Sequence, residues 1–153
     1  MNQVLVVHPP LTVARDFIDY PYLTNLGALQ VGATLRQAME DGGGSVRIVD
    51  SFCLPGSGLA WRDDGRAHVG ASVDEVVEQC LRADEGEDAP QWSHIVVAYA
   101  PFHRPPHRDD VLAGVLEALR GAQLEMLKRN RIENEGEALP STWGAFVLDG
   151  AWE

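Results

Sequence analysis

The stretch that most constrains the fold lies near the start of the chain, where the apolar run Val4–Val7 ends at His8-Pro9-Pro10. An apolar run without polar alternation is typical of a strand buried on both faces of a parallel sheet. The two prolines end such a strand, because proline donates no ladder hydrogen bond and restricts the residue before it. Ligands of open α/β sheets bind beyond the carboxyl ends of the strands. This turn is therefore either the edge of a binding site or only a rigid connection.

Further apolar runs predict strands at Val46–Val49, Ile95–Ala98 and Ala145–Leu148. Helices are predicted over Asn25–Asp41, from the capping box that begins at Ser72, and from a cap at Asp109 or Asp110. Strands that alternate with helices predict a parallel sheet covered on both faces. We therefore expect an α/β, flavodoxin-like (Rossmann-like) three-layer domain with a mostly parallel sheet of about four strands in the order 2-1-3-4.

The connections between these elements are long. The segment Thr12–Tyr22 is rich in aromatic residues and is expected to be either a wall over a flat ligand or an Ω-loop packed on itself. Within Ser51–Gly70, a hairpin turn is expected at Asp63–Arg66, with Trp61 tucked in. The segment Tyr99–Arg108 follows a predicted buried strand and gathers proline, aromatic and histidine residues. In the order 2-1-3-4 it would lie beside His8-Pro9-Pro10, which predicts a binding crevice there.

Composition narrows the classes of function. A length of 153 residues indicates one domain, and a net charge of −11 argues against nucleic acid or an anionic membrane as partner. No apolar run approaches the ~20 residues of a membrane span, and no signal pattern precedes the first strand, so we expect a cytoplasmic protein. Cys53 and Cys80 are the only cysteines, which excludes a disulfide framework and a cysteine-rich metal site. Cys80 is expected to be a core residue.

Side chains that could catalyse a reaction are sparse. His103 and His107 have the spacing of two ligands on one helix face, but Pro105 and Pro106 prevent that helix, so a zinc site has little support. Asp50, at the end of the second predicted strand, could hold a ribose hydroxyl, yet the glycine-rich fingerprint of dinucleotide-binding domains is absent. Neither a nucleophile elbow nor a phosphate loop is present.

Several short strings resemble the N-terminal cobalamin-binding domain of B12-dependent radical SAM proteins. They are the strand and turn Val4–Pro10, then Tyr20–Leu23 leading into Leu26–Gln30, the string Thr34-Leu35-Arg36, and the strand ending Val49-Asp50. The resemblance covers residues 1–127 of a single domain spanning 1–153, and it rests on spacing rather than on an invariant motif. Residues 128–153, with the last predicted strand, diverge from it.

This resemblance implies a domain that holds the corrin ring over the carboxyl ends of its strands, with the nucleotide tail beside the sheet. Two family motifs are missing: the Asp-x-His-x-x-Gly string, and the Cys-x-x-x-Cys-x-x-Cys of an iron–sulfur cluster, so no such cluster is expected on this chain. His8 and His103 are candidate axial ligands, although ordinary loop roles are favoured for both. The candidate cofactor-binding residues are His8, Pro9, Pro10, Leu11, Thr12, Asp50, Ser51, Tyr99, Ala100, Pro101, Phe102, His103, Asp149 and Gly150.

Three hypotheses follow. The leading one is a cobalamin-binding module that serves a radical SAM methyltransferase or cyclase on another chain. The second is a small flavodoxin-like enzyme that uses His8, Asp50 and His103. The third is a vestigial association domain, because no fifth strand follows Ala145–Leu148 and a truncated sheet would expose an edge through which a homodimer could form.

Overall fold

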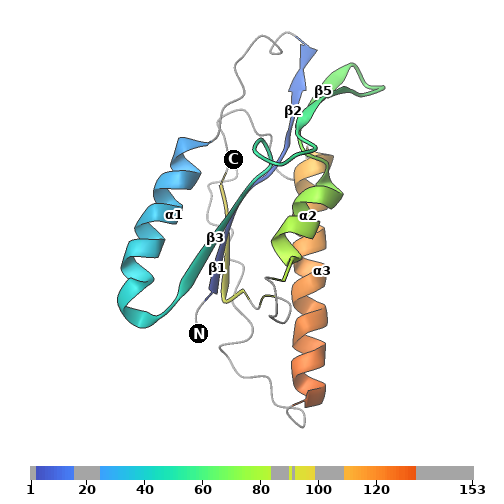
Figure 1. The fold of residues 1–153 in the computed structure, drawn as a ribbon. Coiled ribbons are helices and arrows are strands. Elements are labelled where there is room, and N and C mark those ends of the chain that lie inside the picture. Colours follow the sequence, from blue (N-terminus) through green and yellow to red (C-terminus); the bar gives the residue numbers. More distant parts are fainter. Residues whose placement is uncertain (1–2, 16–24, 84–89, 91, 99–108, 134–153) are drawn as a thin grey trace, which may run out of the picture.

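The structure is a computed structural model that describes residues 3–15, 25–83, 90, 92–98 and 109–133. These residues form an α/β arrangement of two small sheets and three α-helices (Figure 1). The parallel sheet has the order β3-β1-β6 and the antiparallel sheet the order β2-β5-β4. The strands are β1 (Gln3–His8), β2 (Leu11–Ala14), β3 (Ser45–Asp50), β4 (Gly58–Trp61), β5 (Arg66–Gly70) and β6 (His94–Val97). The helices are α1 (Leu26–Met39), the short 3-10 helix η2 (Glu40–Gly42), α2 (Val73–Leu81) and α3 (Asp110–Glu133).

Strand β1 lies at the centre of the parallel sheet, as its apolar sequence predicts. It pairs with β3 along its whole length and with β6 over Val4–Val7. Leu5, Val6 and Val7 are completely buried because both faces of the strand are covered. The order β3-β1-β6 confirms the predicted order 2-1-3 for the strands that the structure describes.

Helices cover both faces of the parallel sheet. Helix α1 lies on one face, and α2 and α3 lie on the other (Figure 1). The main apolar core forms on the second face, where Leu5 and Val7 pack with Val76, Cys80 and Val115. The prediction of Cys80 as a core residue is confirmed.

Helix α1 packs closely on β3 at Gly32, where an added Cβ would overlap the side chain of Ile48. Within this helix only Ala28 and Gly32 are buried. Leu26 and Leu29 are 72% and 39% exposed. Asn25 caps the helix, since its side chain accepts a hydrogen bond from the backbone N–H of Ala28 at 3.2 Å.

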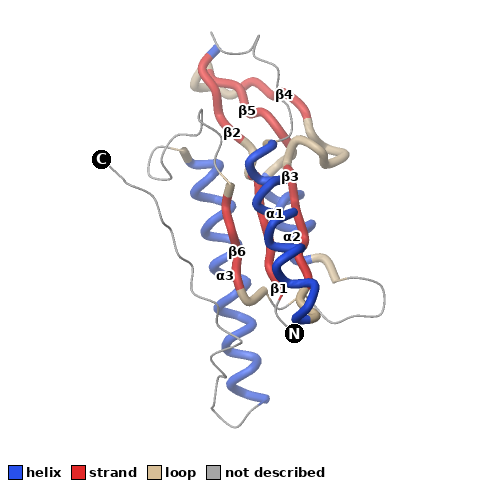
Figure 2. Tube along the Cα trace, turned by 90° about the vertical axis from the view of Figure 1, so that its left-hand side faces the viewer, coloured by secondary structure: helices blue, strands red, loops and turns tan. Residues whose placement is uncertain are grey.

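The antiparallel sheet corrects the prediction of a single, mostly parallel sheet. Leu11 and Thr12 were expected in a loop, but they begin β2, which pairs antiparallel with β5. Leu11 and Val13 pack on Ala67 and Val69, and Thr12 between them is buried as well, so tertiary contacts on both sides of this segment explain the difference. Figure 2 shows this sheet beyond the end of the parallel one.

Strands β4 and β5 form the predicted hairpin. Its turn is closed by hydrogen bonds from Gly65 N to Arg62 O (3.1 Å) and from Arg62 N to Arg66 O (2.9 Å). Trp61 is not tucked in as expected, because 55% of it is exposed.

Helix α3 continues to Glu133, so the first part of the divergent segment 128–153 is helical. Among the described helices, none is both long and apolar enough to cross a membrane. The predicted strand Ala145–Leu148 and most of the aromatic segment 12–22 lie outside the described residues.

Candidate functional site

His8 and Asp50 lie side by side at the carboxyl ends of β1 and β3. They are partners in the ladder register, and His8 Nδ1 lies 3.0 Å from Asp50 Oδ1. The same carboxylate oxygen accepts the backbone N–H of Phe52 at 2.9 Å, and the Phe52 ring meets the imidazole edge to face at 4.8 Å. The imidazole and the carboxyl group of Asp50 therefore form a hydrogen-bonded pair at the ends of two neighbouring strands. Both side chains are buried, with 1% and 7% of the residue exposed, and their orientation is therefore set by the fold.

Ser51 connects the two sheets. Its backbone N–H donates to His8 O at 3.0 Å, and its carbonyl accepts from Ala71 N at 2.8 Å, directly after β5. The residue is completely buried, and its hydroxyl oxygen makes no hydrogen bond in the part of the chain that the structure describes. Gly70 lies against this hydroxyl, at a distance where an added Cβ would be 3.0 Å from the oxygen. The end of the antiparallel sheet is thus built onto the carboxyl end of the parallel one.

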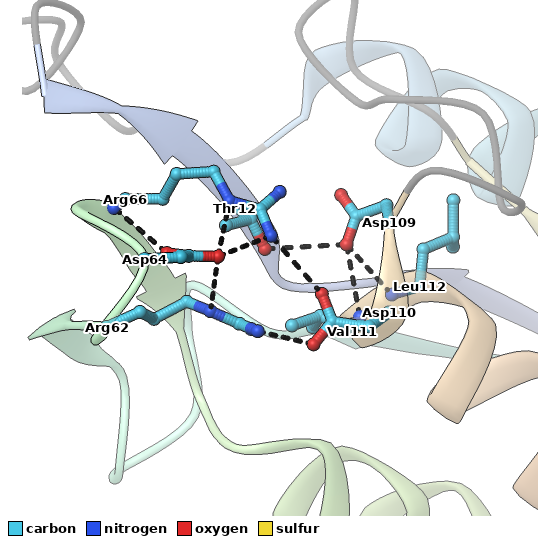
Figure 3. A network of polar contacts seen from close by, with 8 residues as sticks. All are labelled: Thr12, Arg62, Asp64, Arg66, Asp109, Asp110, Val111 and Leu112. Atoms are coloured by element: carbon cyan, nitrogen blue, oxygen red, sulfur yellow. Dashed lines mark hydrogen bonds and ion pairs between the residues drawn. The ribbon is translucent and has the colours of Figure 1, made fainter.

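A second buried polar contact joins β2 to α3. The Thr12 hydroxyl lies 3.4 Å from Asp109 Oδ1, and both residues are almost completely buried. The same oxygen accepts the backbone N–H groups of Val111 (3.1 Å) and Leu112 (3.3 Å), so Asp109 caps α3 as the sequence predicts (Figure 3). Thr12, predicted as a cofactor-binding residue, therefore has a structural partner.

Beside this cap, a network of charges holds the β4–β5 hairpin to the start of α3 (Figure 3). Arg66 pairs with Asp64 at 2.6 Å, and Arg62 donates to Asp110. The Arg66 guanidinium lowers the pKa of the Asp64 carboxyl, and the Arg62 hydrogen bond lowers the pKa of Asp110. Since these carboxylates are exposed, each pair stabilises the fold only modestly, and its main effect is to orient the hairpin.

A pocket of about 510 Å³ lies along β3, which is an edge strand of the parallel sheet. Leu29 from α1, Ile48 from β3 and Leu54 provide apolar surface. Arg47 and Arg82 add two guanidinium groups to the lining of the pocket. The remaining lining residues are Val49, Asp50, Cys53, Gln79 and Ala83.

The guanidinium of Arg47 is positioned by two contacts. It donates a hydrogen bond to the carbonyl of Arg82, and it lies 5.1 Å from the centre of the Trp92 ring. This arrangement holds a positive charge at the edge of the sheet in a chain whose net charge is −11. The pocket can therefore accept a ligand that combines an apolar part with a negative charge.

Comparisons of the chain with protein-family models, curated proteins and solved structures find no match.

The predicted site residues divide into two groups. Those in the described chain are His8, Pro9, Pro10, Leu11, Thr12, Asp50 and Ser51, and all of them are buried. Asp50 is the one among them that lines the pocket. The others, Tyr99, Ala100, Pro101, Phe102, His103, Asp149 and Gly150, lie outside the described residues, so the predicted crevice between the two loops stays a prediction.

Sequence reasoning missed most of the pocket. Its residues come from α1, β3, the turn after β3 and α2, and no short string contains them. Among the described residues, no three His, Cys, Asp or Glu side chains converge.

Proposed function

We propose that this chain is a cytoplasmic, flavodoxin-like cobalamin-binding module that serves a separate radical SAM methyltransferase or cyclase. The sequence resemblance and the central position of β1 support this proposal. The observation that carries it is the pocket along β3, which begins at Asp50 on the carboxyl edge of the sheet. The resemblance implies a place beside the sheet for the nucleotide tail, and the position of this pocket along β3 supports the proposal.

The pocket suits the chemistry of that tail. A volume of about 510 Å³ lies within the range of ~300–1,000 Å³ that is usual for small-molecule sites, although the whole cofactor is larger. Leu29, Ile48 and Leu54 would contact the flat base. Arg47 and Arg82 would pair with the phosphate, because guanidinium groups bind phosphate through paired hydrogen bonds. The corrin ring would then lie beyond the carboxyl ends of the strands.

His8 has a positioning role in this proposal. Its imidazole is buried, is held by Asp50 and packs against Phe52, so it supports the carboxyl end of β1 from inside. The same burial disfavours the alternative of a small enzyme, in which His8 would have to reach a substrate. Bound cobalamin would supply group-transfer or redox chemistry at cobalt, while this chain would bind and orient it.

The test is a titration of the purified protein with hydroxocobalamin, followed by desalting and visible absorption. Retained corrin absorbance is expected for the unchanged protein, and a colourless protein after saturation would overturn the proposal. Leu29→Glu should abolish retention because it places a negative charge among the apolar side chains that would contact the base. Val31→Glu is the matched control, since Val31 is on the same helix, is similarly exposed (42% against 39%) and does not line the pocket.

A second variant, His8→Ala, tests whether the imidazole only supports the end of β1 or also coordinates cobalt. If His8→Ala retains cobalamin with unchanged absorption bands, the imidazole does not coordinate cobalt. Shifted bands would contradict the positioning role.

A further inference from the structure

Strand β4 is an apolar edge strand, and no described strand of the chain pairs with its outer side. All four residues of β4, Gly58-Leu59-Ala60-Trp61, are exposed, including 44% of Leu59 and 55% of Trp61. The strand ends the antiparallel sheet, as Figure 2 shows, with β5 on its inner side. Edge strands of monomeric proteins usually carry charges or proline that prevent further pairing, and β4 has neither.

The alternation of hydrogen-bonded and non-hydrogen-bonded pairs along the hairpin shows which backbone groups of β4 face outward. Arg62 N donates to Arg66 O, which makes these two residues a hydrogen-bonded pair. Hydrogen-bonded pairs alternate along an antiparallel ladder, so Ala60 also bonds to β5. The N–H and C=O groups of Leu59 and Trp61 therefore point to the free edge.

The side chains of the same two residues extend a buried face. Across the sheet, Leu59 stands opposite Val69, and Trp61 stands opposite Ala67. Val69 and Ala67 are buried together with residues of β2, whereas Leu59 and Trp61 leave this apolar face exposed at the edge. Arg15 lies over the Trp61 ring at 5.4 Å from its centre and holds the indole in place.

We propose that two copies of this chain pair through β4, antiparallel, about a two-fold axis at Ala60. In this register Ala60 faces Ala60 of the second copy, and Leu59 faces Trp61 of the second copy on the apolar face. Leu59 of one copy and Trp61 of the other form a hydrogen-bonded pair, because the N–H and C=O groups of both residues point outward. The two-fold axis generates the same pair a second time. Two three-stranded sheets become one continuous sheet, with an aliphatic–aromatic cross-strand pair at each end.

The uncharged edge of β4 is a surface on which two copies can meet without like charges facing each other. Each copy carries a net charge of −11, so most surfaces of two copies repel each other. The four residues of β4 are uncharged, and the self-complementary register leaves no outward N–H or C=O of Leu59 or Trp61 unpaired. So short a strand pair buries less than the ~1,200 Å² of stable complexes, so we expect a reversible, concentration-dependent dimer.

The proposal is tested by sedimentation equilibrium of the full chain over a range of protein concentrations. Ala60→Glu and Ala60→Lys each place two like charges opposite one another at the axis, and each should raise the dimer dissociation constant about fivefold or more. Ala60 is exposed, so both variants keep the hairpin. An equimolar mixture of the two variants should dimerise more tightly than either alone. Thr34→Glu, on the exposed surface of α1, controls for the added charge.

Each outcome decides the question. Dimers that weaken with either Ala60 variant and recover in the mixture establish the pairing and its register. A protein that stays monomeric at all concentrations overturns the proposal. So does a dimer that responds equally to Ala60→Glu and Thr34→Glu, or a mixture that does not recover. Hydrogen exchange gives an independent readout, because the amides of Leu59 and Trp61 should become protected as the concentration rises.

Discussion

Replacing Gly70 by alanine should destabilise the fold where the two sheets meet. Gly70 ends β5 with a φ of +109°, which residues with a Cβ rarely adopt. Holding alanine in such a conformation costs ~1–3 kcal/mol. The new Cβ would also lie 3.0 Å from Ser51 Oγ and 3.1 Å from two carbon atoms of the Phe52 ring. These atoms would have to shift, which costs ~1–3 kcal/mol in a packed region. We therefore expect Gly70→Ala to lower the free energy of unfolding by about 4 kcal/mol.

Gly65 provides the control that separates the two costs. It has a φ of +77° in the hairpin turn, and an added Cβ would have no neighbour within 4 Å. Gly65→Ala should therefore show the backbone cost alone, ~1–2 kcal/mol. Urea denaturation of both variants gives a difference that combines the contacts with Ser51 and Phe52 and the less favourable φ of Gly70.

The same substitution should be detected at His8. The Phe52 ring packs against this imidazole at 4.8 Å, so a displaced ring changes the chemical shifts of the His8 ring protons. Equal destabilisation by Gly70→Ala and Gly65→Ala, with His8 resonances unchanged, would refute the close packing inferred here. Gly65→Ala itself should leave those resonances in place.

Three further predictions concern a helix cap, the thiols and acid pH. Ser72→Ala should lower the free energy of unfolding in urea by about 1 kcal/mol, because Ser72 Oγ accepts the Glu75 N–H at 3.2 Å and caps α2. Burial raises the pKa of the Cys80 thiol to about 12, whereas Cys53 is exposed, so a thiol reagent at mildly alkaline pH should modify Cys53 alone until denaturant is added. The Arg62 hydrogen bond lowers the pKa of Asp110 below its usual 3.8, so this pair stabilises the fold above that pH and is lost as the pH falls through the native pKa. Arg62→Ala should reduce the acid sensitivity of the urea midpoint.

The parts of the fold that follow from local sequence were predictable. The apolar run of β1 has no polar face to expose, so it must lie inside a sheet, and the helical crossovers require parallel neighbours. Ser72 predicts the start of α2, because a serine side chain at a helix N-cap accepts a hydrogen bond from a backbone N–H of the first turn. The turn at Gly65 is closed by hydrogen bonds between Arg62 and residues 65 and 66, so the sequence that predicts it is also local.

The antiparallel sheet was not predictable in this way. Strand β2 has four residues, and its partner β5 lies more than fifty residues later in the chain. Nothing near Leu11 indicates that partner, and the two prolines before it favour a loop on local grounds. The exposure of Trp61 has the same origin, because whether an edge strand is covered depends on tertiary neighbours rather than on its own residues.

The candidate site shows the same division between local and tertiary information. Asp50 was recognised because it ends a strand, and it does line the pocket. Arg47 and Arg82 gave no signal, since an arginine in a strand and another after a helix are ordinary surface residues until the fold brings them together. His8 resembled a ligand in the sequence, and the structure places it in a buried pair with Asp50.

The path of the chain through Pro9 and Pro10 explains why the pocket lies beside the sheet. Both prolines are buried, and they carry the chain from β1 directly into β2, so the antiparallel sheet is built onto the carboxyl end of the central strand. Two contacts join that sheet to the start of α3. They are the hydrogen bond between Thr12 and Asp109 and the ion pair between Arg62 and Asp110. The antiparallel sheet thus lies at the carboxyl end of β1, and the pocket lies along β3 beside it. On the proposed function, cobalamin therefore approaches along β3, and substitutions in the pocket should affect binding before substitutions at His8 do.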